Sequence, residues 1–247
     1  MYKPRISLLC DTQSQANSTA SELKCPYGVH QINKTIKNQE HPYWSHANKT
    51  ATSPQISTYL YNNRDIRFFT YWTRDVYNST GCYNLRCPGF VPANGAALVP
   101  GQAVAPPSVY GEQDHYVTIS LNKDPNSGDW VVYRHDLETP SYLGHFPGDI
   151  CPGTPGTLAL TGFVSYQKGA QGPPMGSGHL PNDQDDKKTA YFKHMKLYDG
   201  KGHTVDPITT PMVRVVDRPD CYDETSVIVK IKSGYMFYYG GPPGCKG

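Results

Sequence analysis

The chain has 247 residues, a formal net charge of +2 and only 18% charged residues. A weak positive charge spread along the whole sequence does not provide the basic patch that nucleic acids or anionic membrane surfaces require. No apolar run approaches the roughly 18 residues that a membrane-spanning helix needs. The 19 Tyr, 23 Gly and 22 Pro favour strands, turns and ordered loops over helices, and aromatic residues in this number are typical of a folded chain.

Residues 1–50 are polar and interrupted by prolines, and they predict an irregular, pro-segment-like arm with little core of its own. The apolar run Ile6–Leu9 is too short for the hydrophobic region of a signal peptide, so we expect that this chain lacks its leader. Four glycosylation sequons, together with seven cysteines, favour a secreted glycoprotein, located outside the cell or in a vacuole. The sequon asparagines are Asn17, Asn33, Asn48 and Asn78.

Seven cysteines in an oxidising compartment predict three disulfide bonds and one remaining thiol, which would be Cys151. The alternative is a set of free or zinc-binding thiols. However, the sequence contains no Cys-x2-Cys or His-x3-His spacing, so we expect neither a metal site nor a site for another cofactor. The expected pairs are Cys10–Cys25, Cys82–Cys87 and Cys221–Cys245.

Residues 51–247 predict one all-β domain, an antiparallel β-sandwich with long ordered loops and little helix. No stretch of ten or more residues has the periodicity of a helix, whereas short aromatic and β-branched runs alternate with turn residues. Asp124–Gly128 and Ser233–Gly234 are typical hairpin turns. The expected strands are Ile56–Tyr61, Arg67–Thr73, Tyr116–Leu121, Trp130–Tyr133, Thr157–Tyr166, Ala190–Tyr198, Met212–Val216, Val227–Ile231 and Tyr235–Tyr239.

The sequence offers few groups for catalysis. Ser177 and His179 stand in a glycine-rich segment that lacks the spacing of a nucleophile elbow, so we interpret it as a turn. A pair of carboxyl groups remains as a candidate catalytic site, because one of two neighbouring acids can act as a proton donor and the other as a base. Each candidate acid is also interpretable as a solvated turn residue, and the charged run Asp183–Lys188 as soluble surface. The candidates are Asp65, Asp75, Glu112, Asp114, Asp136 and Glu138.

Several short motifs follow one another between residues 56 and 247, and a Cys-Pro-x-Gly segment precedes them at Cys25–Gly28. Their order and spacing resemble the neprosin domain family of plant glutamic endopeptidases, which cleave after proline. A strand-bearing block of the family is missing between the Cys25 segment and Phe69. The motifs are Phe69–Thr73, Thr80–Val91, Lys123–Trp130, Leu143–Pro147, Met175–Pro181, Ala190–Phe192 and Tyr239–Pro242.

The resemblance implies a β-sandwich peptidase, made as a secreted zymogen and acting at acidic pH on proline-containing peptides or proteins. Two glutamates and no metal would carry the chemistry. Carried over residue by residue, these glutamates fall near Ala51 and Phe163, neither of which shuttles protons. Two functions follow: a proline-directed endopeptidase, or a non-catalytic secreted module that binds peptides or glycans or is structural. A third, a glycosidase, rests only on the possibility of a carboxylate pair.

Overall fold

The computed structural model describes residues 2–11, 47–55, 58–74, 79–151, 155–164, 166, 169–182, 184–199, 203–209 and 214–246. Their strands pair in antiparallel fashion, and the helical structure among them is limited to the turns α1 (Thr58–Tyr61) and η1 (Gly148–Ile150). Within these ranges no helix is long and apolar enough to cross a bilayer. The prediction of an all-β, antiparallel protein with little helix is confirmed.

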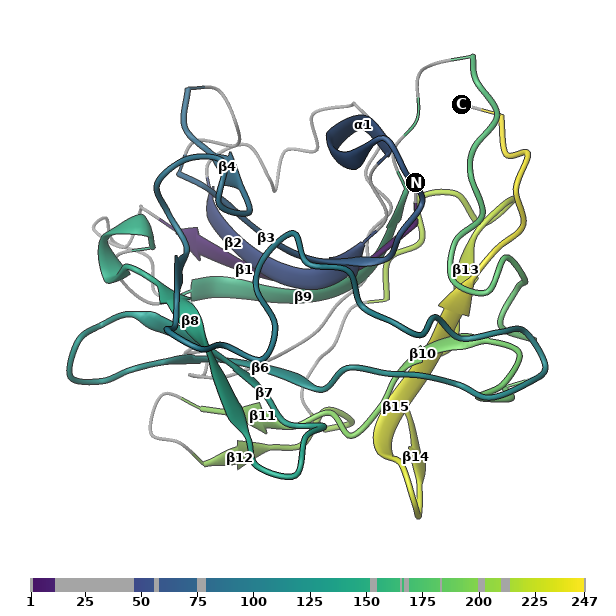
Figure 1. The fold of residues 1–247 in the computed structure, drawn as a ribbon. Coiled ribbons are helices and arrows are strands. Elements are labelled where there is room, and N and C mark those ends of the chain that lie inside the picture. Colours follow the sequence, from purple (N-terminus) through teal and green to yellow (C-terminus); the bar gives the residue numbers. More distant parts are fainter. Residues whose placement is uncertain are drawn as a thin grey trace, which may run out of the picture.

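A wide five-stranded sheet forms one layer of the molecule, with the strand order β4-β3-β2-β1-β9. Figure 1 shows it as a curved layer, with α1 and β4 standing at its concave side. Its central strands pair over nearly their whole length. The strands are β1 (Tyr2–Asp11), β2 (Ala47–Gln55), β3 (Arg67–Thr73), β4 (Cys82–Tyr83) and β9 (Pro155–Val164).

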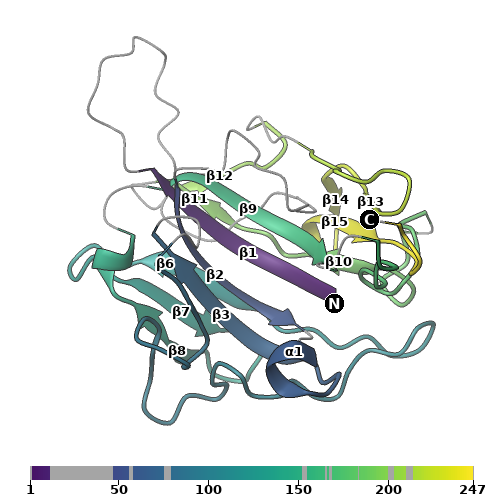
Figure 2. The same ribbon diagram turned by 90° about the horizontal axis from the view of Figure 1, so that it is seen from above.

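Two smaller four-stranded sheets lie on the other side of the wide sheet, as Figures 1 and 2 show. The first has the order β5-β8-β7-β6, and in the second β15 pairs with β10, β13 and β14. The first contains β5 (Val91–Pro92), β6 (Ile119–Lys123), β7 (Trp130–Arg134) and β8 (Ser141–Phe146). The second contains β10 (Ala190–Phe192), β13 (Asp223–Glu224), β14 (Ile228–Lys230) and β15 (Gly234–Gly240), and a separate pair joins β11 (Leu197–Tyr198) to β12 (Thr204–Val205).

Each small sheet shares a hydrophobic core with one edge of the wide sheet. Phe68 of β3 packs with Leu121 and Trp130 of the first small sheet. Leu160 and Val164 of β9 pack with Phe237 and Tyr239 of the second. Burying one such side chain stabilises the fold by about 1.5–3 kcal/mol, so these two cores fix which face of the wide sheet is covered.

Two expected strands differ from the structure because tertiary contacts override local propensity. Residues 58–61 form the helical turn α1 rather than a strand, since Tyr61 turns back to stack edge-on against Phe69, under the guanidinium of Arg67. The predicted strand Ala190–Tyr198 is divided into β10 and β11 at His194. His194 has a φ of 55°, which a strand does not allow.

The expected arm also differs from the structure at residues 2–11, which form the strand β1 rather than irregular chain. β1 pairs with β2 on one side and with β9 on the other. The sequence did not indicate this strand, because proline and charged residues interrupt the alternation of apolar and polar residues that is typical of a strand. In the predicted strand Met212–Val216, residues 214–216 are not in a strand, and the other two lie outside the described residues.

The core between β3 and the first small sheet predicts a large effect for one leucine. We expect Leu121→Ala to lower the free energy of unfolding by about 2–5 kcal/mol, because a fully buried side chain leaves a cavity. The matched change Leu180→Ala, at a side chain that is 39% exposed, should change it by less than about 0.5 kcal/mol. Urea denaturation measures both, and equal effects would contradict this account of the core.

Candidate functional site

The two positions that the family resemblance gives for glutamates lie on one face of the wide sheet. Ala51 of β2 lies opposite Ser7 of β1, and Ser7 lies opposite Ala159 of β9. Position 163 follows Ala159 by four residues along the same strand. Since strand positions alternate between the two faces of a sheet, positions 51 and 163 share a face, on strands separated only by β1.

The same alternation places this face away from the two cores. Leu160 and Val164 of β9 belong to the core beneath the wide sheet, so the odd-numbered positions of β9 belong to the opposite face. On β3, Phe68 faces the core, whereas Tyr71 lies opposite Ala51. We call the face of Tyr71 and of positions 51 and 163 the outer face of the wide sheet.

Gly162 of β9 leaves no room for a side chain on the core side of the wide sheet. A Cβ atom added to Gly162 would lie 2.6 Å from Cδ2 of Tyr239 and 2.7 Å from Sδ of Met175, so a side chain there would force both neighbours to move. This packing therefore requires glycine at 162.

Aromatic side chains border the outer face beside position 51. The rings of Tyr71 and Tyr83 are 5.9 Å apart between centroids, and those of Phe69 and Tyr61 are 5.8 Å apart. Tyr71 is the residue directly opposite Ala51. The described side chains beside position 51 are therefore aromatic.

A rigid turn carries Tyr83 to the edge of this face. The Cys82–Cys87 disulfide closes the turn, and buried Asn84 holds it from inside. The Asn84 carboxamide oxygen accepts a hydrogen bond of 2.8 Å from the Thr70 amide, and its amide group donates one of 2.7 Å to the Tyr61 hydroxyl. Outside the turn, Tyr83 and Leu85 remain 39% and 45% exposed, so the turn presents two apolar side chains to solvent.

The second predicted disulfide, Cys221–Cys245, is also present. Asp220 lies beside it, and the three residues have the spacing of a metal site. Both sulfur atoms are consumed in the disulfide, so neither is available as a thiolate ligand. The disulfide therefore links the two ends of the C-terminal hairpin region covalently, and the cluster does not offer three ligands to a metal.

Among the remaining cysteines, Cys151 differs from the prediction. Cys151 is disulfide-bonded and fully buried, so the expectation that it is the unpaired thiol is wrong. The spacing of the cysteines along the chain did not reveal this bond, because such spacing does not show which distant residues lie close together in the fold. The expected pair Cys10–Cys25 falls on side chains outside the described part of the chain.

Several predicted positions cannot be placed from the described residues. The sequon residues Asn17, Asn33 and Asn78 lie outside the described ranges, as does the candidate acid Asp75. Asn48 lies in β2, but its side chain is outside the description. Glycosylation at these asparagines stays a prediction.

The remaining candidate acids bind neighbouring cations or lie in solvent. Asp65 forms an ion pair of 2.9 Å with Arg67, and Asp136 one of 2.8 Å with Arg134. These contacts explain both residues as structural. Glu112 and Glu138 are exposed, as expected of solvated turn residues.

The serine–histidine segment is a turn, as expected. Gly176 and Gly178 have φ values of 65° and 83°. The Ser177 hydroxyl is buried without a hydrogen-bond partner among the described residues, while Nδ1 of His179 lies 3.2 Å from the Ser177 carbonyl oxygen. His179 therefore contacts the backbone of Ser177 and does not activate its hydroxyl.

The acidic run 183–188 is not simply soluble surface, because Asp186 joins a polar cluster on the second small sheet. The Lys193 ammonium lies 3.7 Å from a carboxylate oxygen of Asp114 and 3.5 Å from one of Asp186. Tyr191 donates a hydrogen bond to Asp114, and Tyr238 donates one of 2.5 Å to Asp186. The hydrogen bond from Tyr191, followed by the charge of Lys193, lowers the pKa of Asp114 despite partial burial.

This cluster brings two carboxylates to one ammonium group, but it does not separate them into an acid and a base. A lowered pKa keeps Asp114 ionised, and Lys193 neutralises the charge between the two acids. The cluster instead fastens two loops to the second small sheet. Sequence reasoning listed Asp114 but missed its partners, which lie 72 or more residues further along the chain in Asp186, Tyr191 and Lys193.

A second acid that the sequence did not single out is Glu224 of β13. Its side chain is only 4% exposed, with the Arg214 guanidinium 3.7 Å away. Arg214 also binds the adjacent Asp223 and the Glu224 backbone carbonyl. Burial raises the pKa of Glu224 to about 8; Arg214 acts in the opposite direction, and Asp223 adds to the rise. Glu224 therefore holds a proton at neutral pH in the folded state.

Comparison with known families agrees with the motifs and the fold. A family model described as Neprosin matches residues 25–242 of the chain. The match spans the aromatic border of the wide sheet, both small sheets and positions 51 and 163.

Glu224 predicts a specific dependence of stability on pH. Its pKa of about 8 in the folded state lies above its ordinary value of 4.5, so folding retains a proton that the unfolded chain loses between these values. The free energy of unfolding should therefore fall as the pH rises from 4.5 to 8, by a few kcal/mol. Glu224→Gln should remove this fall and make the protein more stable than the wild type at pH 8.

Denaturant titrations at pH 5 and pH 8 measure the effect. The matched change Glu138→Gln, at an exposed side chain, should leave the profile of the wild type unaltered. A Glu224→Gln protein that loses as much stability as the wild type between these pH values would contradict the assignment.

Proposed function

Because the chain belongs to the neprosin family, we propose that it is a secreted protein that binds extended, proline-containing peptides without hydrolysing them. The observation that carries this proposal is the outer face of the wide sheet. In this proposal Ala51 and Phe163 occupy the family's two acid positions, and aromatic side chains lie beside position 51.

The chemistry of a two-acid peptidase explains why hydrolysis would be lost. One carboxylate removes a proton from the attacking water, and a carboxylic acid gives a proton to the leaving nitrogen. A methyl group at position 51 and a phenyl group at position 163 do neither. Losing either partner already disables one of these steps, and in this proposal both positions lack an acid.

The two polar clusters elsewhere do not replace these acids. Glu224 carries a proton, but its side chain is almost completely buried and paired with Arg214, so a peptide does not reach it. Asp114 and Asp186 are more exposed, but Lys193 lies between them. An ionised Asp114 does not donate the proton that a leaving nitrogen needs.

The exposed end of the aromatic border, Tyr83 together with Leu85, provides the binding surface in this proposal, since Tyr71 and Phe69 are buried. Proline-rich segments adopt an extended, preformed helix and dock onto aromatic surfaces. Tyr83 and Leu85 are exposed on a turn that a disulfide and Asn84 already hold in place. A rigid surface loses little conformational entropy when a ligand binds, which favours even a small contact area.

The chemistry of the cysteines supports secretion. The disulfides Cys82–Cys87 and Cys221–Cys245, with a further bond at Cys151, are typical of an oxidising compartment. The four sequons agree with passage through the secretory pathway. Glycosylation and an extracellular or vacuolar location are part of this proposal.

A peptide-cleavage assay separates the proposal from the endopeptidase alternative. Purified protein is incubated with an internally quenched proline-containing peptide from pH 2.5 to 7, with pepstatin present to suppress contaminating aspartic peptidases. We expect no cleavage above the level of a heat-denatured sample, because neither position 51 nor 163 carries an acid. Cleavage after proline by the native protein would overturn the proposal and establish the endopeptidase.

Fluorescence anisotropy with a labelled proline-rich peptide tests binding. We expect Tyr83→Ala to weaken binding by about fivefold or more, as loss of an aromatic anchor typically does. The control Tyr116→Ala removes another exposed tyrosine, 56% exposed and outside the wide sheet, and should leave the affinity unchanged. Absence of binding by the wild type, or equal losses in the two variants, would refute the assignment of the surface.

A further inference from the structure

The first small sheet has a second face, turned away from its core, that carries a row of rings. Leu121, Trp130 and Val132 occupy the core face. Tyr133 of β7 lies opposite Ser120 on one side and Tyr142 on the other. These positions belong to the opposite face, because a strand alternates its side chains.

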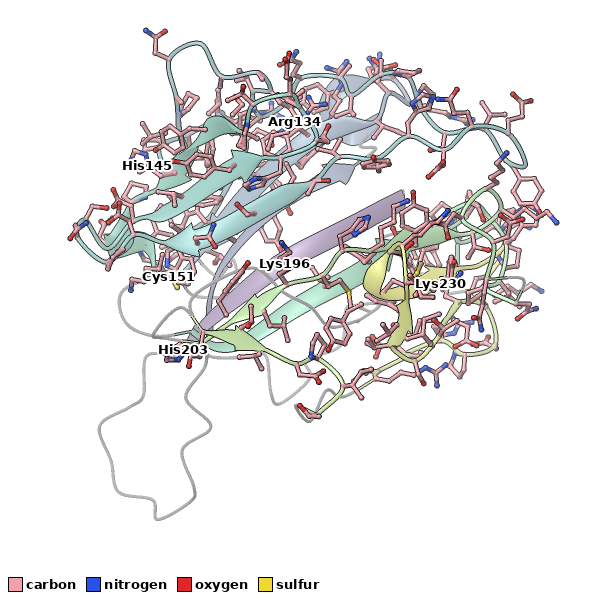
Figure 3. The ribbon with its side chains drawn as sticks, turned by 90° about the horizontal axis from the view of Figure 1, so that it is seen from below. Arg134, His145, Cys151, Lys196, His203 and Lys230 are labelled. Carbon is pink, nitrogen blue, oxygen red and sulfur yellow. A yellow bond between two sulfur atoms is a disulfide. The ribbon has the colours of Figure 1, made fainter. Side chains whose placement is uncertain are left out.

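Tyr142 and His145 form one flat platform on this face. The Tyr142 hydroxyl lies 2.7 Å from Nδ1 of His145, and the two ring planes differ by only 3°. Burial, followed by the neighbouring Tyr133 and Asp129, raises the pKa of Tyr142, so the phenol stays protonated. On the other side of the imidazole, Nε2 lies 3.8 Å from an Asp129 carboxylate oxygen. His145 is labelled on this sheet in Figure 3.

The row continues across the sheet beyond the platform. The ring of Tyr133 lies 5.2 Å from that of Tyr142, and the ring of His135 lies 6.1 Å from that of Tyr133. Hydrogen-bonding groups accompany the rings: Nε2 of His135 lies 2.8 Å from the Ser120 hydroxyl, and the Asn122 amide donates to the same hydroxyl at 3.1 Å. The face therefore alternates flat carbon surfaces with hydroxyl, amide and imidazole groups.

We propose that this face binds a neutral carbohydrate chain. The C–H groups on one side of a sugar ring carry partial positive charge and pack against the negative face of an aromatic ring. Sugar hydroxyls exchange hydrogen bonds with hydroxyl, amide and imidazole groups like those of Ser120, Asn122 and His135. The row of rings supplies the first kind of contact, and the polar groups beside it supply the second.

The charges on this face select a neutral ligand. Arg134 is paired with Asp136, and Lys123 lies over the core residue Trp130, so neither cation is directed to the row of rings. The carboxylate that the row does contact, Asp129, repels an anionic chain. A protein partner fits less well, because the core of a protein interface is depleted of charged residues, whereas this row contacts the carboxylate of Asp129.

This surface is separate from the one proposed for peptides. The peptide surface lies on the outer face of the wide sheet, and the row of rings lies beyond the first small sheet, with the core of Phe68, Leu121 and Trp130 between them. A carbohydrate ligand therefore neither requires nor obstructs peptide binding. The two proposals are tested independently.

Affinity electrophoresis in native gels tests the carbohydrate proposal with hydroxyethylcellulose and xyloglucan as neutral probes and polygalacturonate as an anionic probe. We expect a neutral polysaccharide to retard the wild type. Tyr142→Ala should weaken the interaction at least about tenfold, because the ring is lost. Tyr142→Phe should weaken it less, because the ring remains and only the hydrogen bond to His145 is removed. The control Tyr116→Ala should bind as the wild type does.

Circular dichroism establishes that each variant is folded, and His145→Ala replaces Tyr142→Ala if that protein does not fold. Failure of both neutral probes to retard the wild type would overturn the proposal. Retardation by polygalacturonate alone, or retardation that the loss of either ring does not reduce, would overturn it as well. Since none of these measurements involves a peptide, their failure leaves the peptide proposal intact.

Discussion

The close contact between β9 and β15 at Gly162 constrains the rest of the structure. With no side chain at 162, Tyr239 and Met175 approach the backbone of β9 and close the core beneath it. This contact fixes which positions of β9 face that core, and therefore that position 163 belongs to the opposite face. On the proposal that the family's second acid position falls at 163, Phe163 leaves that opposite face without its acid.

The acids that remain in the described part of the protein illustrate why a carboxylate alone does not make a catalyst. Asp114 and Asp186 share Lys193 and phenol donors, and the pKa of Asp114 is lowered, which favours its charged form. Glu224 is buried, and burial favours its neutral form although the Arg214 guanidinium lies beside it. An acid–base pair needs both kinds of environment within reach of one substrate, whereas here the two environments occupy different clusters, and one of them is closed to solvent.

The sequence predicted those elements whose local chemistry agrees with their place in the fold. Arg67–Thr73 and the hairpin across Asp124–Gly128 combine strand-forming residues with a turn that closes them, and the structure confirms both. The prediction from sequence failed where contacts between distant residues determine the local structure. α1 depends on the stacking of Tyr61 against Phe69, and β1 depends on partner strands on both sides. The polar clusters were missed for the same reason. No local pattern indicates that Lys193 meets Asp114, or that Glu224 is enclosed.

On the proposed placement of the family acids at positions 51 and 163, their replacement changes the constraints on the sheet itself. Two carboxylates close enough to cooperate repel one another when both are charged and cost desolvation when they are sheltered, and active sites commonly sacrifice stability in this way. Ala51 and Phe163 remove that cost, while the aromatic border next to position 51 is unaffected. The wide sheet is then free to act as a rigid support. Its outer face and the row of rings beyond the first small sheet lie on opposite sides of one core, so the scaffold can hold a peptide on one side and a polysaccharide on the other without either ligand excluding its neighbour.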